Sequence, residues 1–127
     1  MRETGNGRRG TARRGEALAA LLLRLKGYRI EARNWRCPLG EIDIVARDRD
    51  TLVFVEVKSR TGASAGSPED AVNPHKQARL VQLAQVYLSR TCGETPPCRF
   101  DVIAVERRRP LPRIRHLRAA FRADGMV

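Results

Sequence analysis

The fold follows from residues 40–60, which read GEIDIVARDRDTLVFVEVKSR. Apolar and polar residues alternate on both sides of a polar segment, residues 48–51, that has the length of a hairpin connection. We therefore predict two antiparallel strands over residues 41–47 and 52–59. If residues 48–51 form the turn, Arg47 pairs with Leu52, and Asp43 then lies directly opposite Glu56.

This register brings two carboxylates together, because directly opposed residues share a sheet face with Cβ atoms roughly 4.5 to 5.5 Å apart. Glu41 falls opposite Lys58 on the same face. The other face is expected to be apolar and to carry Ile42, Ile44, Val53, Val55 and Val57. Paired carboxylates are hard oxygen ligands that suit Mg²⁺ or Mn²⁺. The pattern predicts either a divalent-metal site or a hydrated sheet surface with an ordinary Glu41–Lys58 pair.

The N-terminal region divides into a basic arm and the start of a domain. Residues 1–14 are rich in Gly and Arg, so we predict a mobile basic arm over residues 1–12 and a single domain over residues 13–127. Helical spacing of leucines predicts a helix from about residue 11 to residue 26. A strand over residues 28–33 and a loop over residues 34–40 complete the region.

The C-terminal half offers one long helix and one clear strand. Residues 61–66 predict a loop, and Ser67-Pro68 with Asp70, then Asn73-Pro74, are two helix-start signals. The apolar stripe of the helix is Leu80, Leu83, Ala84, Tyr87 and Leu88. Residues 100–105 predict a buried strand beside the hairpin, and residues 107–113 a basic loop. The spacing of Ile114, Leu117 and Phe121 fits either a short helix or an edge strand.

The composition is that of a folded protein with a polyanionic partner. Hydrophobic residues make up 42% of the 127 residues, and the net charge is +11. Only Lys26, Lys58 and Lys76 are lysines, so the excess charge is mostly arginine, whose guanidinium group matches phosphate. We expect a nucleic acid as partner, and an arginine-rich solvated surface is the alternative. The candidate contacts are Arg13, Arg14, Arg60 and Lys76.

The cysteines and the apolar segments predict a cytoplasmic protein. Cys37, Cys92 and Cys98 are odd in number and form no CxxC motif, which favours reduced thiols. Residues 17–23 are too short for a membrane span and are followed by no cleavage site.

Two motifs of the hairpin resemble those of a known superfamily. Residues 40–45 (GEIDIV) and 53–60 (VFVEVKSR) resemble the active-site strands of the PD-(D/E)xK nucleases, especially the archaeal Holliday-junction resolvases. Together with Gly15-Glu16, Gly27-Tyr28, Arg33-Asn34, Lys76 and residues 99–102, the chain looks like the YraN family of uncharacterised bacterial proteins over about residues 13–121. The resemblance implies an α/β, restriction-endonuclease-like fold, with a central mixed β-sheet flanked by helices.

The same resemblance implies roles for individual residues. Asp43 and Glu56 would be metal ligands, Lys58 would position or help to activate the attacking water, and Glu16 would complete the carboxylate set from the first helix. These four residues are the catalytic candidates, with Mg²⁺ or Mn²⁺ as the ion. Ile42 stands where the superfamily has a proline, a departure that removes no ligand.

Three functions compete at this point. The first is a metal-dependent endonuclease for branched or otherwise structured DNA, which by analogy with the resolvases would work as a homodimer. The second is a catalytically inactive nucleic-acid-binding module with the nuclease fold. The third, an adaptor that binds acidic proteins or a membrane surface through its arginines, leaves the Asp43, Glu56 and Lys58 arrangement unexplained.

Overall fold

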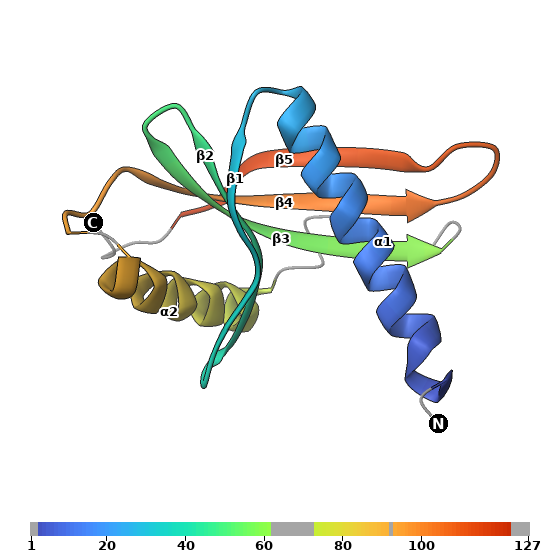
Figure 1. Ribbon diagram of the computed structural model, residues 1–127, viewed down its shortest axis with the longest axis horizontal. Helices are drawn as coiled ribbons and strands as arrows, with labels where there is room; N and C mark the ends of the chain where they lie inside the picture. The colour runs from blue at the N-terminus through green and yellow to red at the C-terminus, as the bar shows by residue number, and fades with distance from the viewer. Residues whose placement is uncertain (1–2, 62–72, 92, 123–127) are drawn as a thin grey trace.

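The described part of the chain forms a mixed β-sheet with a helix on each face (Figure 1). The computed structural model describes residues 3–61, 73–91 and 93–122. The elements are α1 (Glu3–Leu25), β1 (Arg29–Cys37), β2 (Gly40–Asp48), β3 (Thr51–Thr61), α2 (Pro74–Thr91), β4 (Cys98–Arg107) and β5 (Arg113–Phe121).

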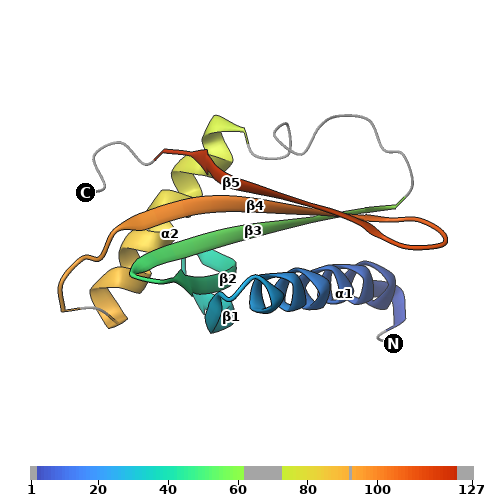
Figure 2. The same cartoon turned by 90° about the horizontal axis from the view of Figure 1, so that it is seen from above.

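The sheet order is β1-β2-β3-β4-β5, and only the β3–β4 pair is parallel. A parallel pair needs a crossover connection, and α2 lies within it. Figure 2 shows α1 and α2 on opposite sides of the sheet. The mixed sheet with flanking helices confirms the predicted fold class and is consistent with a restriction-endonuclease-like fold.

The predicted register of the β2–β3 hairpin is confirmed up to the Ile44–Val55 pair, whereas the predicted pair of Asp43 with Glu56 lies beyond the end of the ladder. Arg47 pairs with Leu52, and the ladder continues to Ile44 opposite Val55. Asp48 also pairs with Thr51, so the connection is shorter than predicted and leaves only residues 49 and 50 outside the ladder. A two-residue hairpin of this kind requires positive φ, and Arg49 has φ 58°.

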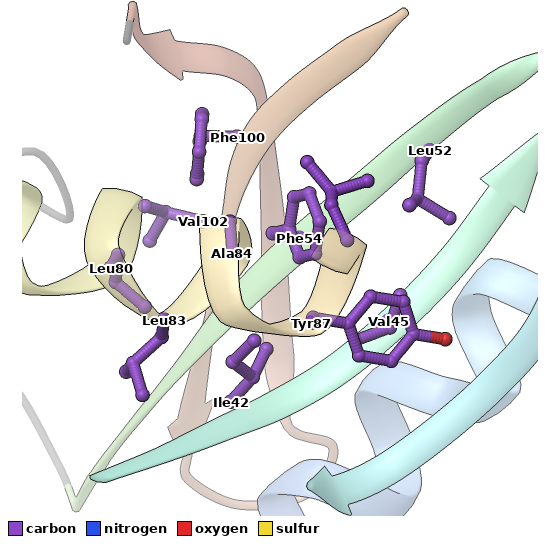
Figure 3. Packing of buried hydrophobic residues seen from close by; sticks show 11 residues of the cluster. Ile42, Val45, Leu52, Phe54, Leu80, Leu83, Ala84, Tyr87, Phe100 and Val102 are labelled. Carbon is purple, nitrogen blue, oxygen red and sulfur yellow. The ribbon is translucent and has the colours of Figure 1, made fainter. Parts of the chain in front are cut away.

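Both faces of the sheet are apolar, so the predicted division into one apolar and one charged face was wrong. On one face, Ala19, Ala20 and Leu23 of α1 pack against the sheet. On the other, the stripe of α2 packs against Ile42, Val45, Leu52, Phe54, Phe100 and Val102 (Figure 3). Because α2 covers the face that was expected to be charged and exposed to solvent, the charged residues of the hairpin are confined to the two ends of its strands.

Two element boundaries differ from those predicted, and the structure decides between the two alternatives left open for the C-terminal segment. α1 begins at Glu3, so most of the segment expected to be a basic arm belongs to the helix. The expected loop over residues 34–40 is mostly strand, because Trp35 packs edge-on against Tyr87 with ring centroids 5.3 Å apart. The C-terminal segment is an edge strand, with Phe121 stacked on Phe100 at 4.8 Å.

The second helix begins at the second of its two predicted start signals. Asn73 is the N-cap, since its Oδ1 accepts a 2.9 Å hydrogen bond from the backbone N–H of Lys76. Pro74 is the first helical residue. This cap fixes Lys76 in the first turn of α2. The signal at Ser67, Pro68 and Asp70, and the loop predicted over residues 61–66 beyond Thr61, lie outside the described residues.

Two further expectations concern the thiols and the membrane. Cys37 has a free thiol, Sγ of Cys98 lies 3.3 Å from the carbonyl oxygen of Pro96, and Cys92 lies outside the described residues. Over the part of the chain that the structure describes, neither helix is both long and apolar enough to cross a bilayer.

Candidate functional site: a carboxylate cluster where two strands separate

The site lies at the point where the ladder between β2 and β3 ends. Beyond the Ile44–Val55 pair, the carboxylate of Asp43 takes the place of a backbone partner, because its Oδ2 accepts a 2.8 Å hydrogen bond from the N–H of Val57. This bond turns the Asp43 side chain toward β3. Glu56 precedes Val57, so the register places both predicted acidic residues at this opening.

Three carboxylates converge there from two elements. One oxygen each from Glu16 on α1 and from Glu41 and Asp43 on β2 lie within 4.8 Å of one another, a grouping that could hold a metal ion. Asn34 of β1 links two of them, since its Nδ2 donates to Glu16 Oε1 at 2.6 Å and to Glu41 Oε2 at 2.8 Å. Asn34 has φ 53°, a conformation that asparagine tolerates better than most residues.

Close packing of α1 on the sheet brings Glu16 into this cluster. Glu16 is 8% exposed. At the preceding position, a Cβ on Gly15 would collide with Oγ of Ser59 on β3. Glycine at this position therefore lets the helix backbone approach β3, and the next residue is brought to the opening between β2 and β3.

The electrostatics of the cluster are unfavourable without a cation. The pKa of Asp43 is raised from 3.8 to about 8, first by burial and then by the negative charge of Glu56, with smaller contributions from Glu16 and Glu41. The hydrogen bond from Val57 lowers the pKa but does not compensate. A carboxyl group with a pKa this high is one that lacks a positive partner.

Glu56 has a partner of its own. Its Oε2 lies 3.0 Å from Nζ of Lys76, and the Glu56 side chain is 12% exposed. The structure therefore links Lys76 to the carboxylate site. Lys58 follows Glu56 by two positions on β3, so the two side chains share a face of the strand, and Lys58 is half-buried.

The predicted Glu41–Lys58 pair was wrong. Glu41 instead lies opposite Arg36 of β1, and the two side chains approach to 3.8 Å between Nε and Oε1. The register had been extrapolated past the last β2–β3 pair, where β2 keeps β1 as its partner. Glu41 was thereby missed as a member of the cluster, although its position two residues before Asp43 is a signal for a shared strand face.

The other predicted nucleic-acid contacts are dispersed. Arg13 and Arg14 are exposed on α1, and Arg60 is half-buried near the end of β3. Of these, Arg14 lines a surface hollow together with residues of the β4–β5 connection.

In a second buried polar cluster, around Asp101, the polar groups form hydrogen bonds and ion pairs with one another. Asp101 is 1% exposed and accepts hydrogen bonds from Arg99 at 2.9 and 3.0 Å and from the N–H of Ala119 at 2.9 Å. His116 Nε2 lies 2.7 Å from the same carboxylate. Burial alone would raise the pKa of Asp101, but the bonds from His116 and Arg99 outweigh it and hold the pKa below its ordinary value. This cluster ties β5 to β4.

Comparison with known proteins gives one family. The sequence model of the uncharacterised protein family UPF0102 matches residues 15–105. A UPF0102 protein of Symbiobacterium thermophilum is 55% identical over 92 residues, covering 72% of this chain and 78% of the relative. One from Anaeromyxobacter dehalogenans is 46% identical, covering 95% and 90%, and one from Nitrosococcus oceani is 44% identical, covering 87% and 90%.

Proposed function

The chain belongs to UPF0102, the YraN family, whose activity is uncharacterised, and from its site we propose that it is a metal-dependent endonuclease that hydrolyses phosphodiester bonds. The proposed substrate is branched or otherwise structured DNA. The observation that carries the proposal is the approach of Glu16, Glu41 and Asp43 to within 4.8 Å in a chain of net charge +11. Acidic groups that crowd together on a strongly basic protein suit a cation that a polyanionic substrate also approaches.

The donor set fits Mg²⁺ or Mn²⁺. All three groups offer hard carboxylate oxygens, and the raised pKa of Asp43 reports negative charge that a dication would neutralise. We assign Asp43, Glu16 and Glu41 as the residues that would hold the ion, with Glu56 as a further oxygen donor beside Asp43. When bound, such an ion polarises a phosphoryl oxygen and lowers the pKa of a water molecule.

The remaining polar residues of the site orient the carboxylates and neutralise negative charge. The Val57 N–H and the Asn34 amide hold the carboxylates of Asp43, Glu16 and Glu41 in fixed positions, which lowers the reorganisation needed at the moment of reaction. The ammonium group of Lys58, on the face of β3 that carries Glu56, adds positive charge near the phosphate and can position the attacking water. Lys76 holds the Glu56 carboxylate at 3.0 Å.

The proposal is tested by cleavage of labelled four-way and linear DNA with Mg²⁺ or Mn²⁺. We expect wild type to give product that EDTA abolishes, and Asp43→Ala to give none. Asp50→Ala is the matched control, because Asp50 is an exposed carboxylate in the turn of the same hairpin. Equal product from wild type and Asp43→Ala at every protein concentration contradicts the proposal.

One observation favours the alternative of an inactive nucleic-acid-binding module. The Lys76–Glu56 ion pair, 3.0 Å long, already supplies a positive charge where an ion would otherwise interact with Glu56. This alternative expects salt-sensitive DNA binding that Glu56→Ala leaves unchanged. Calorimetric titration separates the two functions, because an active enzyme should bind Mn²⁺ in wild type and lose that binding in Asp43→Ala.

A further inference from the structure

The connection between β4 and β5 carries the consecutive arginines Arg107, Arg108 and Arg109. Together with Arg14 and Leu18 of α1 and with Pro112, they line a hollow of about 470 Å³. We call this feature the arginine hollow. Figure 1 shows the β4–β5 connection at the same end of the sheet as the N-terminal half of α1.

We propose that the arginine hollow is the docking site for the phosphate backbone of a nucleic-acid strand that continues across α1 to the carboxylate cluster. The proposal deepens the proposed function and rests on it for what happens at the carboxylates. It differs from the contacts expected from sequence, which included Arg14 but none of residues 107–109.

The lining of the arginine hollow fits phosphate. Four of its six lining residues are arginines, and the other two, Leu18 and Pro112, are uncharged, so no acidic residue is among the described residues that form it. Guanidinium groups present planar pairs of N–H donors that match phosphate oxygens. Because the four arginines come from both α1 and the β4–β5 connection, the tertiary fold gathers them around a single hollow.

The geometry of α1 favours a polymer over a single anion. Gly15 faces the sheet, where a Cβ would meet Ser59 of β3 and Val105 of β4. Since successive helical residues are about 100° apart, Arg14 and Glu16 project to opposite sides of this contact. Leu18, one turn after Arg14, lies on the same side as Arg14, which is the side of the hollow. A free phosphate in the hollow cannot reach the carboxylate cluster on the far side of α1, whereas a strand that crosses the helix spans both.

Binding is measured apart from cleavage by fluorescence anisotropy of labelled duplex and four-way DNA in EDTA. The test variant is Arg107→Ala, Arg108→Ala and Arg109→Ala together. The matched control replaces Arg24, Arg29 and Arg90 by Ala, which removes the same charge from the last turns of α1 and α2 and from the start of β1. Circular dichroism and thermal unfolding establish that each variant is folded.

We expect the logarithm of the DNA association constant to fall less steeply with the logarithm of salt concentration, between about 50 and 200 mM, in the test variant. The slope should be smaller in magnitude by two to three units, since each phosphate contact contributes about 0.9. The control should stay close to wild type. Replacing residues 107–109 by lysine, which keeps the charge, should restore most of the slope and shows that a loss in the alanine variant comes from charge rather than misfolding.

Equal loss in the test and control variants overturns the proposal, because binding would then follow net charge alone. It is also overturned if the test variant keeps its DNA affinity but loses binding to phosphatidylserine vesicles, since the hollow would then serve a membrane surface. Failure of the proposed function would give a different result. DNA binding would still depend on the arginine hollow, but no DNA cleavage would depend on Asp43.

Discussion

Changing Asp43 to Asn should remove a pH dependence of folding that the carboxylate cluster imposes. In the native protein the pKa of Asp43 is about 8, compared with 3.8 for the free group. Between these values the native state holds a proton that the unfolded state has released. Stability is therefore greatest at low pH within this window and falls as the pH rises toward 8.

The size of the effect follows from the one proton involved. A difference of one bound proton changes the free energy of unfolding by about 1.4 kcal/mol per pH unit. From pH 5 to pH 7 the wild type should thus lose on the order of 3 kcal/mol relative to Asp43→Asn. The amide of asparagine can still accept the hydrogen bond from Val57, so the substitution removes the charge and keeps that contact.

Urea unfolding at several pH values, in EDTA, measures this difference. Asp50→Asn, in the exposed hairpin turn, should follow the wild-type pH dependence and is the control. In a separate series without EDTA, Mn²⁺ at about one hundred times its dissociation constant should stabilise wild type at pH 8 by about 2.7 kcal/mol and leave Asp43→Asn unchanged. Parallel pH profiles of wild type and Asp43→Asn would refute the reasoning.

Two further substitutions test the packing that holds the site. Gly15→Ala should destabilise the protein by about 1 kcal/mol net in urea unfolding, because the clash with Ser59 costs about 1–3 kcal/mol and improved helix propensity returns about 1 kcal/mol. Gly93→Ala, whose methyl group meets no atom within 4 Å, is the control, and an equal effect at both positions contradicts the close approach of α1. Asp101→Asn should cost about 1–3 kcal/mol, since Arg99 would lose a buried carboxylate partner but keep Asp48 at 3.0 Å. An unchanged free energy of unfolding there would show that the second polar cluster does not stabilise the fold.

The hairpin could be predicted from sequence because its determinants are local. Alternating apolar residues and a short polar turn fix the pairing of Arg47 with Leu52, and no distant contact is needed to specify that register. The same holds for the start of α2, where Asn73 caps its own helix.

Which residues form the site could not be predicted from local sequence patterns, because it depends on contacts between distant parts of the chain. Glu41 was assigned to Lys58 by extending the β2–β3 register, whereas Glu41 pairs with β1 beyond the point where that ladder stops. Asn34, which bridges Glu16 and Glu41, lay in a segment expected to be a loop. Spacing along α1 gave no indication that Glu16 faces the sheet, because that contact depends on how closely Gly15 approaches β3.

The burial of the second sheet face by α2 also could not be predicted from local sequence patterns. Strands with alternating residues are typical of sheets with one solvated face. Here the parallel pairing of β3 with β4 requires a crossover, and α2 in that crossover buries Phe54 and Phe100. The acidic residues Glu41, Asp43 and Glu56 therefore lie at the open end of the hairpin, and other charged residues lie at the turn, rather than being spread over a face.

The central claim is that Glu16, Glu41 and Asp43 together hold a divalent cation. Crystals of the protein soaked in Mn²⁺ test it directly through the anomalous scattering of manganese. We predict one strong anomalous peak within coordination distance of Asp43 and at least one of the two glutamates, and no peak there in crystals of Asp43→Asn. A wild-type map with no peak at these carboxylates, or with manganese bound only elsewhere, would contradict the account.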